Sequence, residues 1–337
     1  MSENRPQQIV LASRPQGEVS VDNFRLEPLS LPQMADGQVL VRAEYLSLDP
    51  YMRGRMDDRK SYAPPVAIGA AMEGESVGEI IDSRHPDWPV GTVVTARTGW
   101  RSHAAVVADG LRRLDPAAAP VTTALGVLGM PGFTAYAGLK EIGKPTHGET
   151  LVVAAASGPV GSLVGQLARR AGARSIGIAG GAEKCRALIE QFGFDVALDH
   201  QAPNLAEALA AACPDGIDVY FENVGGAVLD AVLPLLNRFA RVPVCGLIAQ
   251  YSGASTDGPD RMPGLMRDIL TKSLTVRGFI NYDLAQLYPV FLQEVGDGVR
   301  DGSIRYREDI VDGLEAAPAA FIGLLKGRNF GKLLVRL

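Results

Sequence analysis

The stretch ETLVVAAASGPVGSLVGQLARRAG, residues 149–172, decides the expected fold of this chain. An apolar strand, ETLVVAA, runs into the turn ASGPVG, and the turn opens a segment whose apolar residues have helical spacing. The turn has the pattern of a dinucleotide-binding motif, with Ala156 in the first glycine position and Gly158 and Gly161 in the other two. Small residues there let the backbone approach a pyrophosphate at a helix N-terminus, where free N–H groups attract negative charge. A tight packing turn is the alternative for these six residues taken alone.

The segments that follow favour the dinucleotide site. Helix-like and strand-like segments alternate, and the strand-like ones cover residues 149–157, 174–180, 195–200, 216–225, 241–249 and 274–282. We therefore predict an α/β fold with a doubly wound, six-stranded parallel sheet of the Rossmann type, in which all six strands are buried. Gly165, one helical turn after the motif, allows close packing of the helix. A longer piece around residues 256–270 is expected to be irregular.

The first third of the chain has a different texture. Short β-branched or alternating runs, such as QVLVRAEYLSL and GTVVTAR, are separated by turn-forming residues, which predicts a mostly β domain. Near the C-terminus, a helical segment at residues 314–329 precedes a strand, FGKLLVRL, that we expect to dock back on this first domain. Two domains also suit a length of 337 residues.

Composition narrows the class of function. A net charge of −5 at pH 7 and dispersed Lys and Arg residues give no basic patch of the kind that nucleic-acid binding requires. The N-terminus lacks the features of a secretory signal, and the most apolar stretch, at residues 151–168, is interrupted by Ser, Gly, Pro and Gln. Cys185, Cys213 and Cys245 are far apart, as expected in a reducing compartment. We expect a cytoplasmic protein that binds neither nucleic acid nor membrane.

The end of the second strand indicates which dinucleotide is bound. An NAD site usually has an acidic residue there that binds the ribose hydroxyls, whereas this chain has Gly180 and Gly181. Lys184 can place a cation near a 2′-phosphate, although most lysines on the first turn of a helix are simply solvated. Because a cation at a helix start works against the helix dipole, we favour the phosphate role and predict NADPH (NADP+) as the cofactor.

Seven stretches resemble the zinc-independent branch of the medium-chain dehydrogenase/reductase superfamily. They are LSLDPYMRGRM (46–56), GMPGFTAYAGL (129–139), AASGPVGSLVGQLA (155–168), GIAGGAEKC (177–185), FENVGG (221–226), CGLIAQY (245–251) and LLKGRNFGKLLV (324–335). The nearest resemblance is to the group of prostaglandin reductases and leukotriene B4 hydroxydehydrogenases, which includes bacterial curcumin reductases and plant alkenal double-bond reductases.

This resemblance implies a domain organisation and an activity. A GroES-like substrate domain would span residues 1–126 and be completed by 303–337, with an NADP-binding Rossmann domain at 127–302. The implied reaction is the NADPH-dependent reduction of the carbon-carbon double bond of α,β-unsaturated ketones or aldehydes. The implied partners are a small electrophilic alkene and a second copy of the chain, in a homodimer.

Zinc-dependent relatives polarise a carbonyl with a zinc ion held by Cys, His and often Glu. Met72 stands where those relatives have a Gly-His-Glu run, and the chain has no CxxC run. Its four histidines are isolated from one another: His85, His103, His147 and His200. We therefore predict that no metal takes part.

Another group must then stabilise the charge that develops on the carbonyl oxygen when hydride adds to the β-carbon of an enone. Tyr251, just past the fifth strand, is predicted to donate that hydrogen bond, because a phenol with an ordinary pKa near 10 stays protonated at neutral pH. This strand end faces the ligand crevice in doubly wound folds. A plain loop aromatic is the alternative. The proton for the α-carbon could come from Tyr251 or from water.

The resemblance carries further residues into the predicted site. Tyr51 and Tyr251 are the predicted substrate-binding residues, and His200 stands where members of the group commonly have a tyrosine that helps hold the 2′-phosphate. A histidine binds phosphate best when protonated, so NADPH affinity is expected to weaken as the pH rises through its titration. The predicted cofactor-binding residues are Pro50, Met130, Thr134, Ser157, Gly158, Pro159, Val160, Gly161, Gly180, Gly181, Lys184, His200, Asn223, Cys245, Tyr251, Phe279 and Asn329. Packing or turn formation is the alternative role for Tyr51, Met130, Thr134, Cys245 and Asn329.

Two other functions stay open at this point. An NADPH:quinone oxidoreductase would share the zinc-free fold and the glycine turn. A non-catalytic NADPH-binding protein would share the fold without the chemistry, since a fold does not fix a function.

Overall fold

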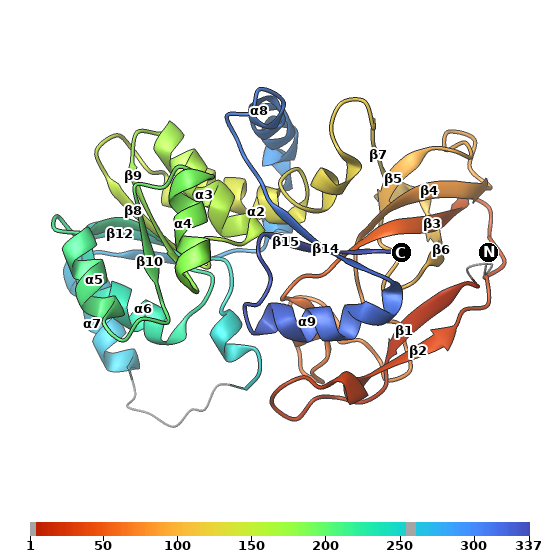
Figure 1. The fold of residues 1–337 in the computed structure, drawn as a ribbon, viewed down its shortest axis with the longest axis horizontal. Helices are drawn as coiled ribbons and strands as arrows, with labels where there is room; N and C mark the ends of the chain where they lie inside the picture. The colour runs from red at the N-terminus through yellow and green to blue at the C-terminus, as the bar shows by residue number, and fades with distance from the viewer. Residues whose placement is uncertain (1–4, 254–260) are drawn as a thin grey trace. The chain divides into compact units, whose positions relative to one another are not determined.

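The computed structural model describes residues 5–253 and 261–337. The chain divides into two compact units, one formed by residues 1–125 and 308–337 and the other by residues 126–307 (Figure 1). In the described part of the chain, no helix has both the length and the apolar character needed to cross a membrane.

The second unit contains a six-stranded parallel sheet in the order β10-β9-β8-β11-β12-β13. Its strands are β8 (Thr150–Ala154), β9 (Arg174–Ala179), β10 (Val196–Asp199), β11 (Ile217–Phe221), β12 (Leu236–Val244) and β13 (Thr275–Gly278). The first strand of the unit, β8, lies in the middle, and the chain winds outward from it in both directions. This is the Rossmann arrangement, which confirms the predicted fold class.

Helices cover both faces of this sheet (Figure 1). They are α2 (Met130–Gly138), α3 (Pro159–Arg170), α4 (Ala182–Glu190), α5 (Leu205–Ala212), α6 (Gly226–Val232), α7 (Met262–Lys272) and α8 (Tyr288–Arg300). Alternate residues of β8 enter different cores: Leu151 and Val153 pack with α2, α3 and α8, and Val152 packs with α5 and α6. A strand that is apolar along its whole length is stable here because each face of the sheet is covered.

Two expectations for this unit were wrong. All four residues of β13 are exposed, because β13 is the last strand in the sheet order and lies at its edge. The piece expected to be irregular contains α7, which begins at Met262 with Pro263 in its first turn, where the missing N–H costs nothing. The rest of that piece lies outside the described residues.

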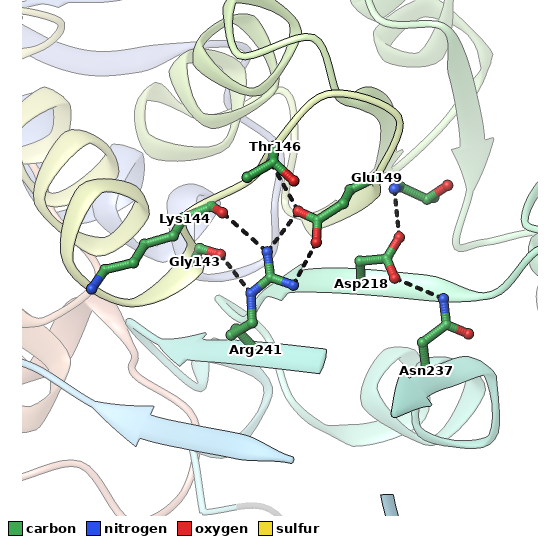
Figure 2. A network of polar contacts seen from close by, with 8 residues as sticks. Gly143, Lys144, Thr146, Glu149, Asp218, Asn237 and Arg241 are labelled. Atoms are coloured by element: carbon green, nitrogen blue, oxygen red, sulfur yellow. Dashed lines mark hydrogen bonds and ion pairs between the residues drawn. The ribbon is translucent and has the colours of Figure 1, made fainter. Parts of the chain in front are cut away.

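The amino edge of the sheet, where its strands begin, carries a network of polar contacts (Figure 2). Arg241 of β12 forms two hydrogen bonds to the carboxylate of Glu149, at 2.8 and 2.6 Å. The same guanidinium donates to the carbonyl oxygens of Gly143, at 2.9 Å, and Lys144, at 3.1 Å. One side chain therefore ties β12 to the segment that leads into β8.

Asp218 of β11 adds further contacts to this network. Its carboxylate accepts a hydrogen bond from the backbone N–H of Thr150, at 2.9 Å, and another from the side-chain amide of Asn237, at 2.8 Å. Together with Arg241, it joins the starts of β8, β11 and β12.

The first unit is mostly β. Its seven-stranded sheet has the order β14-β15-β3-β4-β5-β7, with β6 paired to β3, and β1 and β2 form a separate pair. The strands are β1 (Gln7–Leu11), β2 (Phe24–Pro28), β3 (Gln38–Ser47), β4 (Ser76–Ser83), β5 (Val93–Ala96), β6 (His103–Val107), β7 (Arg112–Arg113), β14 (Glu308–Asp312) and β15 (Lys332–Arg336). Two helices, α1 (Met52–Arg55) and α9 (Ala317–Leu325), belong to this unit. The C-terminal strand β15 pairs antiparallel with β3, as expected.

Candidate functional site

The glycine turn between β8 and α3 is as close-packed as its sequence predicts. A Cβ atom on Gly161 would lie 2.5 Å from the carbonyl oxygen of Ala155 and 2.6 Å from the Cα of Ala156. Ala155 itself has a φ of 49°, a left-handed conformation that a non-glycine residue rarely adopts. Only glycine fits at position 161 without moving the turn.

This turn fits a dinucleotide pyrophosphate. Gly158 is the N-cap of α3 and Pro159 is its first residue, so the N–H groups of Val160 and Gly161 have no acceptor within the helix. Ser157 is buried in the turn at 8% exposure. The N–H groups and the helix dipole would hold the pyrophosphate of a bound cofactor.

The end of β9 brings the predicted 2′-phosphate residues together. Gly181 is the N-cap of α4 with a φ of 88°, and Lys184 lies on the first turn of that helix. A Cβ on Gly180 would lie 2.8 Å from Nε2 of His200, which follows β10. The space beside Gly181 is open, whereas the ring of His200 occupies the position beside Gly180, so a lysine-bearing helix and a histidine from another element meet at this strand end.

Asp199 is a residue of this region that sequence reasoning missed. Its Oδ1 accepts hydrogen bonds from the backbone N–H groups of Gly181 and Gln201, both at 2.9 Å. These bonds, from Gly181 first, hold the pKa of Asp199 below its ordinary value. This chain lacks the acid that an NAD site has at the end of its second strand. Instead, Asp199 at the end of the third strand fixes the backbone at Gly181, after β9. The sequence signal that could have revealed this role is the position of the aspartate, directly before His200.

Asn223 lies at the switch point of the sheet, where the chain order reverses between β8 and β11. Its side-chain amide donates to the carbonyl oxygen of Ala154, the last residue of β8, at 2.8 Å. Ligands of doubly wound sheets bind beyond the carboxyl ends of the strands at such a point. Asn223 therefore lies beside the place that the fold offers to a cofactor.

Tyr251 and Cys245 follow β12 at the same carboxyl edge. The Tyr251 hydroxyl lies 3.5 Å from the backbone nitrogen of Leu247, and a Cβ on Gly246 would lie 3.1 Å from that hydroxyl. The phenol is thus folded back over the loop that begins at Cys245. Burial and the neighbouring Glu222 raise the pKa of the Cys245 thiol to about 12, so this cysteine stays protonated and is no nucleophile.

Met130 and Thr134 occupy the first turns of α2. The Thr134 hydroxyl donates to the carbonyl oxygen of Met130 at 2.8 Å and accepts from the side-chain amide of Asn281 at 3.3 Å. Phe279 follows β13, and its buried ring meets the ring of Phe221 edge to face. With its ring in the core, Phe279 has only its backbone to offer a ligand.

Pro50, Tyr51 and Asn329 belong to the first unit. Tyr51 lies under the guanidinium of Arg55, which is 5.7 Å from the centre of the ring. Asn329 donates to the carbonyl oxygen of Gly331, at 2.8 Å, within its own turn. The geometry of this unit alone assigns these residues no ligand.

A buried ion pair connects the segments that carry these three residues. The ammonium group of Lys332 in β15 donates to Asp49 at 2.6 Å and to the carbonyl oxygen of Leu48 at 2.9 Å. The side chains of Lys332 and Asp49 are 2% and 7% exposed. The loop at Pro50 is therefore anchored to the strand that follows Asn329.

No group of three or more His, Cys, Asp or Glu side chains could hold a metal ion within residues 5–253 and 261–337. Glu73 is the acid that remains of the zinc-dependent pattern, and its carboxylate pairs with the Nε of Arg55 at 3.1 Å.

Comparisons with known proteins agree with this geometry. Residues 7–114 match the family model described as the N-terminal domain of oxidoreductase, and residues 159–296 match the model described as zinc-binding dehydrogenase. The fold, the glycine turn and these matches define a nucleotide-dependent oxidoreductase, and the chain belongs to the medium-chain dehydrogenase/reductase superfamily.

Within that superfamily the chain is similar to reductases of known type. It is 54% identical to the NADPH-dependent curcumin reductase of Escherichia coli (strain K12) over 97% of this chain and 96% of that one. It is 40% identical to the 2-alkenal reductase (NADP(+)-dependent) of Nicotiana tabacum over 95% and 92% of the two chains. Its structure matches CurA from Vibrio vulnificus in complex with NADPH, with a TM-score of 0.94 and 52% identity over 98% of each chain. The predicted family, enzyme class and cofactor, NADPH, are confirmed.

Proposed function

We propose that this enzyme reduces the carbon-carbon double bond of α,β-unsaturated ketones and aldehydes with NADPH. The observation that carries the proposal is the Tyr251 phenol at the carboxyl edge of the sheet, on the side of the glycine turn, in a chain 54% identical to an NADPH-dependent curcumin reductase. Bound NADPH supplies a hydride at this edge. The side chains around it need only orient the alkene and stabilise charge.

Tyr251 stabilises that charge in the proposed mechanism. As the β-carbon of the substrate gains hydride, negative charge builds on its carbonyl oxygen, and the phenol O–H donates to that oxygen. One donor placed where charge develops accelerates a reaction by about two to three orders of magnitude. The α-carbon then takes a proton from Tyr251 or from water.

The remaining proposed contacts divide by ligand. The pyrophosphate binds the turn at Ser157–Gly161, and the 2′-phosphate binds between Gly180, Lys184 and His200. Met130, Thr134, Asn223, Cys245, Phe279, Pro50 and Asn329 line the rest of the cofactor site, and Tyr51 lines the substrate site. The close approach at Gly161 and the open space beside Gly181 support the first two assignments.

Quinone reduction and non-catalytic NADPH binding are the competing functions. The similarity to a curcumin reductase and an alkenal reductase, at 54% and 40% identity, favours alkene reduction over both. No observation on the described residues points specifically to a quinone.

A cytoplasmic homodimer is the proposed form of the enzyme, and an exposed edge supports pairing. The edge strand β13 has Val276 41% exposed, while Met266 and Leu270 of α7 are 55% and 79% exposed. A second copy of the chain could pair with the free edge of β13 and cover the apolar residues that lie four apart on one face of α7. Sedimentation velocity of the purified chain distinguishes a dimer from a monomer.

Steady-state kinetics test the reaction class. A short alkenal, a bulky diaryl enone and a simple quinone are compared with NADPH and with NADH, and the loss of nicotinamide absorbance is followed. We expect turnover of the alkenes with NADPH, and a fall in kcat of about 100-fold or more for Tyr251→Phe. Turnover of the quinone alone would establish the first alternative. Tight NADPH binding without turnover of any acceptor would establish the second.

A further inference from the structure

Glu222 is a buried acid at the carboxyl edge that the proposed mechanism does not use. It follows β11 directly, pairs with Val244 of β12 through a parallel bridge, and is 1% exposed. A carboxyl group is costly to bury without a counter-charge. Its position therefore calls for a role.

The two oxygens of Glu222 have different surroundings. Oε1 accepts hydrogen bonds from the backbone N–H groups of Val224, at 2.6 Å, and Gly225, at 2.9 Å, and from the hydroxyl of Tyr220, at 3.1 Å. Oε2 is buried and has no hydrogen-bond partner among the described residues. One oxygen thus fixes the turn at residues 223–225, and the other takes no part in it.

This turn is hydrogen-bonded to the loop that carries Tyr251. The backbone oxygen of Glu222 accepts from the N–H groups of Cys245, at 2.9 Å, and Gly246, at 3.2 Å. The oxygen of Asn223 accepts from Ile248 at 3.2 Å. Residues 222–225 and 245–249 therefore form one connected layer, and its shape depends on the contacts of Glu222.

We infer that Glu222 is a positioning residue for the reaction, which holds Asn223 and, through the connected loop, Tyr251 in place. The inference rests on the proposed role of Tyr251. The side chain acts through its hydrogen bonds to Val224 and Gly225 and does not touch the reacting atoms.

Opposing effects set the pKa of Glu222. Burial raises the pKa of Glu222, against the hydrogen bonds from Val224, Gly225 and Tyr220 that favour the ionised form. The titratable groups that face it are Tyr220 of β11 and Cys245 after β12, and burial raises the pKa of both.

Two substitutions distinguish the effect of these hydrogen bonds from the effect of the side chain's volume. Glu222→Gln keeps an oxygen at Oε1 and cannot ionise, whereas Glu222→Leu keeps the bulk but leaves two N–H groups without their acceptor. We expect kcat within about threefold of wild type for Glu222→Gln and at least a tenfold loss for Glu222→Leu.

A second measurement does not depend on turnover. Amide hydrogen exchange at Val224 and Gly225 should be slow in the wild type and in Glu222→Gln, and faster in Glu222→Leu. Glu149→Gln, at the amino edge, is the control that should destabilise the fold without changing kcat. Equal exchange in all variants, or a wild-type kcat for Glu222→Leu, would overturn the inference. If the wild type reduces no alkene, the proposed function fails, while the exchange data still test the contacts of Glu222.

Discussion

The two edges of the six-stranded sheet each carry a glutamate, half-buried at the amino edge and buried at the carboxyl edge, and the pKa values of these two acids shift in opposite directions. At the amino edge, burial acts to raise the pKa of Glu149, but hydrogen bonds from Arg241 and Thr146 outweigh it and lower the pKa (Figure 2). At the carboxyl edge, Glu222 has backbone N–H groups and a phenol as partners, so burial prevails and its pKa is raised.

This difference separates stability from function within one sheet. The amino edge pairs its charges, which fixes the starts of β8, β11 and β12. The carboxyl edge keeps glycine turns, a partly exposed lysine, Lys184, and an exposed histidine, His200, all of which a ligand could use. Substitutions at the amino edge should therefore alter the free energy of unfolding, and those at the carboxyl edge should alter binding or rate.

The largest effect is expected at the glycine turn. Gly161→Ala places a Cβ 2.5 Å from the oxygen of Ala155, so the turn must move away from the pyrophosphate position. We expect the Kd for NADPH to rise about 100-fold, since several hydrogen bonds at the helix start lose their alignment. Fluorescence of bound NADPH measures this change.

Gly148→Ala is the matched control for this turn. Gly148 has a φ of 84° and open space around its Cβ position, so alanine there adds backbone strain alone. It should cost about 1 kcal/mol of stability and leave NADPH binding unchanged. An unchanged Kd for Gly161→Ala would mean that the turn does not bind the pyrophosphate.

The next effect should appear at the amino edge. Arg241→Met removes both hydrogen bonds to Glu149. Because the side chains of Arg241 and Glu149 are only 21% and 23% exposed, we expect a loss of about 2 kcal/mol in the free energy of unfolding. Because the folded-state pKa of Glu149 lies below its unfolded value, the pair stabilises the fold at neutral pH. That stability is lost as the pH falls through the lowered pKa.

Urea denaturation at several pH values measures both effects. In Arg241→Met, the part of the acid sensitivity that comes from Glu149 should disappear, and kcat should match the wild type. A large loss of kcat in a folded Arg241→Met enzyme would contradict the assignment of stability to the amino edge and of function to the carboxyl edge.

The smallest effect concerns the choice of cofactor. Lys184→Ala should raise the Kd for NADPH about tenfold, which corresponds to about 1.4 kcal/mol for one charge-assisted contact, and leave the Kd for NADH unchanged. Arg186→Ala, at an exposed residue of the same helix, is the control. Equal losses for both cofactors would assign Lys184 to the solvated surface of α4.

Local patterns determined much of this protein. Alternating strand and helix signals predicted the Rossmann sheet, and the spacing of Ala156, Gly158 and Gly161 predicted the close-packed turn between β8 and α3, because such signals depend on residues near one another in the chain. The resemblance of seven stretches gave the superfamily and the reductase class. The exposure of β13 was missed, because an apolar pattern does not reveal which strand lies at an edge.

Only the tertiary structure decided the direction in which the pKa values of the two glutamates shift. Arg241, distant in the chain, reaches Glu149 and lowers its pKa, whereas burial raises the pKa of Glu222, whose hydrogen-bond donors are backbone N–H groups and the phenol of Tyr220. Likewise, Asp199 of β10 fixes Gly181 after β9, and Lys332 pairs with Asp49 across 283 positions. A pKa depends on burial and on neighbouring charges, and folding creates both from residues that the sequence keeps apart.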